Sequence, residues 1–117
     1  MLVIEFKKSG AIVRKWSVYD IEEAVYTLIQ LVPIGCITTY NDVAKVLGIS
    51  PRLVAKILSR NRNPIAIPCH RIVKSDNGLG GYTLNGKKVP EFKKRLIDLE
   101  SLHNLCRYSL SELLEIK

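Results

Sequence analysis

The chain has 117 residues, of which 47% are hydrophobic and 25% charged, and it carries a formal net charge of +7. This length suits one compact domain, and no stretch reaches the roughly 20 apolar residues that a membrane span needs. The start, MLVIEFKKSG, lacks the order of a secretory signal, so we expect a cytoplasmic protein, or a nuclear one in a eukaryote, without membrane association. The basic excess favours a polyanionic partner if it gathers on one face.

The three cysteines, Cys36, Cys69 and Cys106, are an odd number, are widely separated and form no CxxC pair. This spacing predicts neither a disulfide framework nor a zinc site, so we expect reduced thiols and no metal or other cofactor. Cys36 is expected in the core, and Cys106 and His103 in structural or surface positions.

The first third of the chain predicts a β-hairpin and then a helix. LVIEFKK and AIVRKW have the pattern of two short strands within residues 1–18, joined by a turn in which Gly10 supplies a positive φ. From Asp20 the apolar residues recur at helical spacing until Pro33 ends the pattern. The next residues, PIGCIT, are expected to form a loop.

Residues 39–61 predict two short helices joined by the turn GIS. Thr39 is the expected N-cap of the first helix, with Asp42 in a capping-box position and Gly48 at its end. Ser50 is the expected cap of the second, whose charged side carries a basic stripe formed by Arg52, Lys56 and Arg60. This is the outline of a helix-turn-helix, and equally of an ordinary helical hairpin with a solvated charged face.

The remaining sequence predicts a long loop and two more helices. Residues 62–83 are rich in glycine and proline and should be extended or looped. A closing helix is expected at 90–101, and its buried face should consist of Phe92, Leu96 and Leu99. Its more exposed side should carry Lys93, Lys94 and Arg95. A short last helix, SLSELLEIK, begins at a capping box, and its packed side should consist of Leu110, Leu113 and Leu114.

Residues 67–73, IPCHRIV, place a thiol next to a histidine and an arginine. A nucleophilic cysteine needs a base or a positive environment that lowers its pKa, and the base in turn needs a group that orients it. His70 is the candidate base for Cys69, and Glu100 is the candidate orienting group. The alternative is that Cys69 is a small buried hydrophobe, which is the usual state of a free cysteine.

Several spaced motifs resemble those of the O6-alkylguanine-DNA alkyltransferases, a family of DNA-repair proteins. PCHR follows an Asn-x-x-Pro-Ile-x-Ile lead and precedes Gly-Gly-Tyr, as in the active-site signature of that family. IGCITTYNDVA and PRLVAKILSRN are similar to its helix-turn-helix, and KKRLIDLE to its closing helix. The resemblance covers residues 20 to 101. It implies an α+β, mainly α fold: one winged-helix-like domain over 1–117, with a short β-hairpin and an extended active-site loop.

The resemblance also implies a reaction without a cofactor. Cys69 accepts the alkyl group, a methyl for example, from O6 of guanine, with His70 as general base through a water and Glu100 holding the histidine. Tyr40 donates to guanine N3, and the product thioether is final, so each molecule acts once. The residues implied to line or support the base pocket are Asn61, Ile72, Tyr82 and Thr83.

The implied partner is double-stranded DNA containing O6-alkylguanine, entered from the minor groove by a monomer. The target nucleotide must leave the stack before a thiolate can reach it. Arg52 then fills the vacated place, and the residues implied to hold DNA phosphates are Lys56, Arg60, Arg62 and Arg71.

Three departures from the family pattern and two alternative functions remain. Only a short hairpin precedes the first helix, the stretch TLNGKKVPEF is longer than in many relatives, and residues 102–117 extend beyond the family core. One alternative is a non-catalytic, alkyltransferase-like sensor of alkylated DNA, although such proteins lack the cysteine. The other is a helix-turn-helix regulator in which Cys69 is buried and inert.

Overall fold

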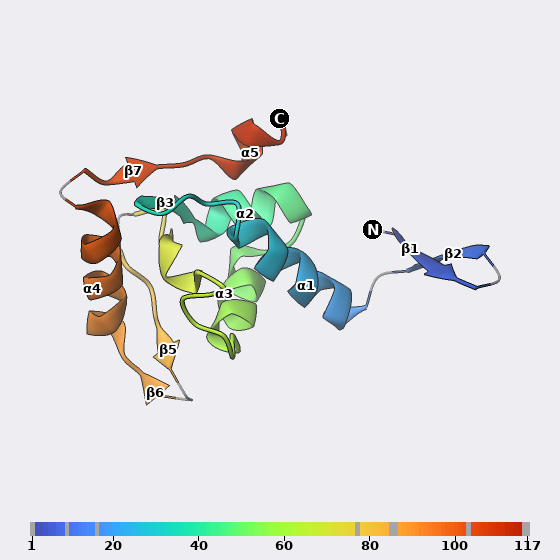
Figure 1. The fold of residues 1–117 in the computed structure, drawn as a ribbon, viewed down its shortest axis with the longest axis horizontal. Coiled ribbons are helices and arrows are strands. Elements are labelled where there is room, and N and C mark those ends of the chain that lie inside the picture. Colours follow the sequence, from blue (N-terminus) through green and yellow to red (C-terminus); the bar gives the residue numbers. More distant parts are fainter. Residues whose placement is uncertain are drawn as a thin grey trace.

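The computed structural model describes residues 2–8, 10–15, 17–76, 78–84, 87–102 and 104–115. Figure 1 shows a group of helices with short strands at its edges. The elements in chain order are β1 (Leu2–Lys7), β2 (Gly10–Lys15), α1 (Val18–Ile29), β3 (Cys36–Thr39), α2 (Tyr40–Leu47), α3 (Pro51–Ser59), a 3-10 turn (Cys69–Arg71), β4 (Ile72–Val73), β5 (Thr83–Leu84), β6 (Lys87–Lys88), α4 (Pro90–Ser101), β7 (Cys106–Arg107) and α5 (Leu110–Leu113).

The N-terminal hairpin and α1 follow the sequence prediction with shifted ends. β1 and β2 pair antiparallel and lie beyond the start of α1, away from the other elements (Figure 1). The helix α1 begins two residues earlier than expected, because the Asp20 carboxylate accepts hydrogen bonds from the backbone N–H and the hydroxyl of Ser17, at 2.6 and 2.9 Å. It ends at Ile29, and residues up to Val32 form turns. Among the described helices, none is long and apolar enough to cross a membrane.

The two helices predicted for 39–61 are confirmed, with their caps. Thr39 Oγ1 accepts from the backbone N–H of Asp42 at 3.0 Å, and Ser50 Oγ from that of Leu53 at 3.1 Å. Gly48 ends α2 in the left-handed region, at a φ of +69°. The two helices pack on α1 around a core that includes Val25, Ile29, Val43, Val54 and Ile57. Burial of each such side chain contributes roughly 1.5–3 kcal/mol to folding.

Residues 36–39, expected in a loop, form the central strand of a three-stranded parallel sheet in the order β4-β3-β7. Thr38 and Thr39 pair with Ile72 and Val73 of β4, and Ile37 pairs with Arg107 of β7. The strand forms through pairing with residues that are distant in the sequence, so no local sequence pattern predicts it.

Cys36 and Cys106 lie opposite each other in the β3–β7 register and form a disulfide. The expectation of three reduced thiols is therefore wrong for this pair, although Cys36 is buried as predicted. The two residues are 70 positions apart, and only the strand pairing brings them together. Cys69 is the free cysteine.

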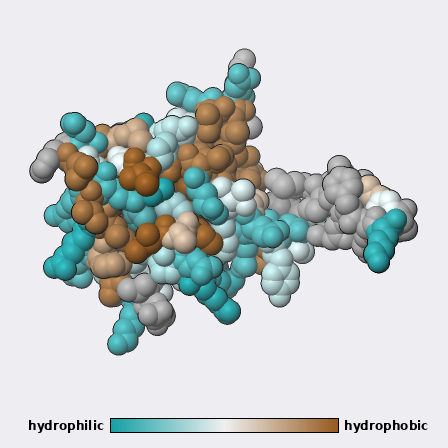
Figure 2. Space-filling model, viewed as in Figure 1, coloured by the Kyte–Doolittle hydropathy of each residue, from teal (hydrophilic) through white to brown (hydrophobic). Residues whose placement is uncertain are grey.

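The C-terminal tail is attached to α2 by a second contact. The Asp42 carboxylate accepts from the backbone N–H groups of Leu110 and Ser111, at 2.6 and 3.1 Å, and from the hydroxyl of Thr38 at 2.6 Å. It therefore caps α5 rather than completing a capping box on α2. Leu110 is fully buried, but Leu113 and Leu114 are 49% and 43% exposed, so their predicted packing is wrong. Figure 2 shows hydrophobic residues at the surface around α5.

Reduction of the disulfide is expected to lower the free energy of unfolding by about 2 kcal/mol, the lower end for a cross-link closing a long loop, because the Asp42 contact remains. Denaturant titrations of the oxidised and the reduced protein measure the difference. A Cys106→Ser variant should match the reduced protein and should not respond to reductant. Detection of three free thiols by titration of the denatured, unreduced protein would contradict the Cys36–Cys106 disulfide.

The closing helix α4 is confirmed, but it presents a different face to the core. Its buried residues are Lys93 and Ile97, whereas Leu99 is 69% exposed and Phe92 and Leu96 are partly buried. The predictions for Lys93 and Leu99 are therefore wrong. The polar groups that contact the Lys93 ammonium are part of the candidate site.

Candidate active site

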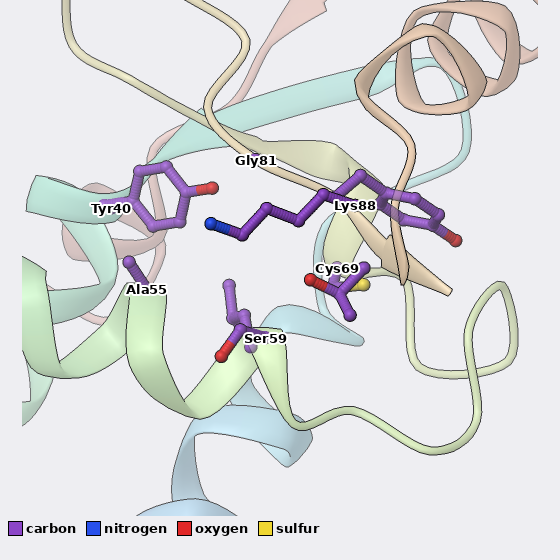
Figure 3. A pocket seen from close by; sticks show the side chains of 9 residues that line it. Tyr40, Ala55, Ser59, Cys69, Gly81 and Lys88 are labelled. Atoms are coloured by element: carbon purple, nitrogen blue, oxygen red, sulfur yellow. The ribbon is translucent and has the colours of Figure 1, made fainter. Parts of the chain in front are cut away.

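A pocket of about 190 Å³ opens between α2, α3 and the segment that precedes α4. Its lining consists of Tyr40, Ala55, Leu58, Ser59, Cys69, Gly81, Tyr82, Thr83 and Lys88. Figure 3 shows Tyr40 and Cys69 on different walls of this pocket, with Ala55 and Ser59 of α3 along a third side. A volume of this size fits a small flat group rather than a large ligand.

Local hydrogen bonds fix the position of Cys69. Its backbone N–H donates to Ile67 O at 2.8 Å, and the following residues close a 3-10 turn. The Asn61 side chain at the end of α3 donates to Ile67 O at 2.8 Å and accepts from the backbone N–H of Asn63 at 2.9 Å. Asn61 thus joins the helix-turn-helix to the loop that carries the thiol, the place that the resemblance implies for it.

His70, Arg71 and Glu100 form one hydrogen-bonded group behind Cys69. His70 Nε2 lies 2.7 Å from Glu100 Oε1, and Arg71 donates to both carboxylate oxygens, at 3.0 and 2.7 Å. His70 is fully buried, and its Nδ1 has no hydrogen-bond partner within the described part of the chain. With the Nε2 proton donated to Glu100, Nδ1 is the free acceptor of a neutral imidazole.

The electrostatics favour a neutral thiol beside a neutral base. Burial raises the pKa of the Cys69 thiol, and the Asn61 side chain and the charge of Lys93 oppose this rise only in part. Burial lowers the pKa of His70 despite the Glu100 carboxylate. The hydrogen bonds from Arg71 hold the pKa of Glu100 below its usual value. The thiol therefore needs a base to become a thiolate, and the imidazole is unprotonated and able to act as one.

Lys93 is a site residue that the sequence interpretation missed. It is fully buried, and its Nζ donates to Tyr40 Oη at 3.2 Å and to Gly81 O at 3.3 Å. Burial lowers its pKa from 10.5 to about 8 and raises that of Tyr40 to about 12. A signal was available in its spacing of three, four and seven residues from Leu96, Ile97 and Glu100, which its exposed neighbour Lys94 does not share.

Tyr40 and Tyr82 are placed at the pocket as the resemblance implies. At Gly80, whose φ is +75°, an added Cβ would lie 2.6 Å from Tyr40 Oη, so the approach of Tyr40 requires a glycine there. Tyr82 is buried and packs on Phe92, with ring centroids 5.8 Å apart. The expected wall residue Thr83 also lines the pocket. Ile72 lies in β4 and is fully buried.

The basic residues assigned to DNA divide into two groups. The exposed ones are Arg52, Lys56, Arg60 and Arg62, on α3 or directly after it. Arg71 is buried, and its guanidinium bonds Glu100 and, at 2.9 Å, the carbonyl oxygen of Val32. Arg71 therefore supports the His70–Glu100 pair and is unavailable to a phosphate, which corrects its assignment.

The described residues contain no group of three or more His, Cys, Asp or Glu arranged as metal ligands. His103 lies outside the described residues.

The fold and the site define a small helix-turn-helix protein with a free thiol at a pocket beside its helices and a buried histidine–carboxylate pair that begins at the next residue. The profile of the family described as 6-O-methylguanine DNA methyltransferase, DNA binding domain, matches residues 20–102, most of the chain. The chain belongs to this family.

Individual relatives agree with the family match. The methylated-DNA–protein-cysteine methyltransferase of Pyrobaculum aerophilum is 47% identical over 83 residues, which cover 69% of this chain and 53% of the relative. The crystal structure of the O6-methylguanine-DNA methyltransferase of Pyrococcus kodakaraensis is 40% identical, with a TM-score of 0.60 over 71% of this chain and 47% of that one. A Mycobacterium tuberculosis OGT solved in complex with DNA is 25% identical, with a TM-score of 0.64 over 80% and 54%. The chain spans about half the length of the curated relatives it matches.

Proposed function

We propose that the protein repairs DNA by direct reversal, transferring an alkyl group from O6 of guanine to Cys69 in a single irreversible turnover. The observation that carries this proposal is the buried His70, which follows Cys69 in the same 3-10 turn, is held by Glu100 through Nε2, and has no partner for Nδ1 among the described residues. A thiol with a raised pKa requires such a base, and a base with a lowered pKa is ready to act. Family membership and the names of the relatives support the same reaction.

In the proposed reaction, His70 Nδ1 takes the thiol proton of Cys69 through one bridging water. The thiolate attacks the alkyl carbon, a sulfur–carbon bond forms, and the bond from that carbon to O6 breaks. The electron pair of the broken bond stays on guanine, which accepts a proton from Tyr40. The thioether is a poor leaving group, and no described residue at the pocket can regenerate the thiol, so one protein molecule repairs one lesion.

Lys93 completes this proton path. Its ammonium donates to Tyr40 Oη, which lowers the cost of moving the phenolic proton to guanine and can replace that proton. Without a cationic neighbour, a phenol whose pKa is raised to about 12 by burial would be a weak donor. Lys93 also stabilises the Cys69 thiolate electrostatically.

DNA reaches the pocket through the helix-turn-helix in this proposal. The exposed basic residues of α3 face away from the core and suit phosphates, and Arg52 is at the start of α3, where it can replace a flipped nucleotide in the stack. The DNA complex of the M. tuberculosis relative supports binding to DNA. We propose entry from the minor groove by a monomer.

The test is the intact mass of the protein after incubation with a duplex that carries one O6-methylguanine. The expected result is the gain of one methyl group per molecule, which peptide mapping places on Cys69. A Cys69→Ala variant should bind the lesion and gain no methyl. The exposed Lys45→Ala variant, far from the thiol in sequence and not a pocket residue, serves as a control for handling.

The same experiment separates the alternatives. Tight binding to the lesion without methyl transfer in the wild-type protein would overturn the proposed reaction and favour a sensor. Binding that does not distinguish the lesion from unmodified guanine would favour a plain helix-turn-helix regulator. Neither outcome is expected, because a sensor or a regulator does not need a base held by a carboxylate next to a cysteine.

A further inference from the structure

Lys88 is the pocket residue that the proposed reaction leaves unused. It lies in β6, directly opposite Thr83 of β5, and both side chains line the pocket. Directly opposed residues of an antiparallel pair share one face of the hairpin, so Lys87 belongs to the other face. Figure 3 shows the side chain of Lys88 extended across the view of the pocket, with its ammonium end on the side of Tyr40.

The charge of Lys88 has no acidic partner among the described residues, and the pocket lining contains no carboxylate. A second ammonium, that of Lys93, already lies on Tyr40. Tyr40 therefore has its donor, and no hydrogen bond or ion pair among the described residues holds the Lys88 ammonium in place. Because Lys88 is exposed, its long side chain can leave the pocket without disturbing the core.

We propose that Lys88 gates the pocket: its side chain lies across the mouth of the pocket in the free protein and, on DNA, moves aside to bind the backbone phosphate beside the flipped nucleotide. This inference rests on the proposed function, since it presumes that a guanine enters between Tyr40 and Cys69. A base that enters the pocket must pass the Lys88 side chain, and the phosphate of the entering nucleotide remains outside, at the mouth. The phosphate therefore becomes available to the Lys88 ammonium when the entering base displaces that side chain.

This exchange makes Lys88 a specificity-determining residue. A nucleotide in DNA brings the phosphate that binds the displaced ammonium, whereas a free base must displace Lys88 without that compensation. The gate therefore favours guanine in a polymer over free guanine derivatives. The gain is electrostatic and falls with added salt.

Three variants separate the two parts of the proposal. Lys88→Ala removes both the long side chain and its charge. Lys88→Met keeps a side chain of similar length but removes the charge. Lys87→Ala removes the same charge from the other face of the same strand and is the matched control. Each is compared with the wild-type protein for methyl transfer from free O6-methylguanine base and from a duplex, and for duplex affinity between 50 and 200 mM salt.

Lys88→Ala is expected to react severalfold faster than wild type with the free base, and Lys88→Met at the wild-type rate. In both Lys88 variants the slope of log affinity against log salt concentration should be less steep by about one unit. The loss of duplex affinity between 50 and 200 mM salt should therefore be about threefold smaller than in the wild-type protein. Lys87→Ala should leave the free-base rate unchanged.

An unchanged free-base rate in Lys88→Ala, or a full salt slope in both Lys88 variants, overturns the gate. An equal effect of Lys87→Ala on the free-base rate overturns it as well. If the wild-type protein transfers no methyl from either substrate, the proposed function fails instead, and the salt slopes alone then decide whether Lys88 binds phosphate.

Discussion

Replacement of Glu100 by Gln is expected to reduce the rate of methyl transfer by about 10²- to 10⁴-fold, the range of general-base catalysis. Glu100 fixes the His70 tautomer by accepting the Nε2 proton, at 2.7 Å. An amide can present its NH₂ group to Nε2 instead, which places the imidazole proton on Nδ1 and removes the base. The rate is measured with excess protein over a methylated duplex, so that a single turnover is followed.

The same substitution is expected to lower the free energy of unfolding by about 3 kcal/mol, because it leaves the buried guanidinium of Arg71 without its carboxylate. His70→Gln is the matched variant: it should lose the rate but keep the Arg71–Glu100 ion pair and most of the stability. If Glu100→Gln transfers methyl at the wild-type rate while folded, His70 is not the base.

The stability of the wild-type protein should decline in two steps on acidification. His70 has a lowered pKa in the folded state, so below about pH 6.5 the unfolded chain binds a proton that folded His70 does not, and stability falls. Glu100 has a lowered pKa as well, so its contribution is present above about pH 4.3 and is lost as the pH falls through its folded value. In Glu100→Gln only the second step should be smaller, because Asp42, whose pKa is also lowered in the folded state, still contributes to it.

The Lys93→Met substitution is expected to raise the free energy of unfolding and to slow methyl transfer. The fall in the Lys93 pKa from 10.5 to about 8 corresponds to about 3 kcal/mol of destabilisation at neutral pH, which an apolar side chain would avoid. Methyl transfer should fall by about 10²-fold, the typical cost of losing one preorganised donor, because Tyr40 loses the ammonium that supports its proton. Denaturant titration and single-turnover rates measure the two effects.

The sign of the pH dependence identifies Lys93 as the cause. Below pH 8 Lys93 is charged in both states, and the folded protein bears the full cost of burying it. Between pH 8 and 10.5 the folded protein releases this proton first, so the unfolded chain binds more protons and wild-type stability rises relative to Lys93→Met. Lys94→Met, at the exposed neighbour on α4, should match wild type in stability and rate. A Lys93→Met protein no more stable than wild type at pH 7 would show that the ammonium is well solvated.

The elements that the sequence predicted well are those with local causes. Thr39, Ser50 and Gly48 set the ends of α2 and α3 by their own side chains or backbone, and the helical spacing of apolar residues predicted the buried face of α3. By contrast, β3 exists through pairing with β4 and β7. The Cys36–Cys106 disulfide and the Asp42–α5 cap have the same kind of cause, since each joins residues about 70 positions apart.

The candidate site divides in the same way. Motif residues such as Cys69, His70 and Glu100 were found from the sequence, because a thiol, a base and an orienting carboxylate are recognisable by type. Arg71 was misassigned and Lys93 was misplaced, because a cation in a sequence looks the same whether it faces solvent, a buried carboxylate or a hydroxyl. Which of these it faces depends on how α4 rotates against the sheet.

The sequence by itself determined the two capped helices of residues 39–61 and the family resemblance, and it predicted Cys69 as the nucleophile and His70 as its base. The tertiary structure decided which cations belong to the pocket, which cysteines pair, and what holds the tail. The physical reason is the sequence distance over which the interactions act. Caps and periodicity depend on residues a few positions apart, whereas the burial of Lys93 and the Cys36–Cys106 pairing depend on contacts between segments that meet only when the chain folds.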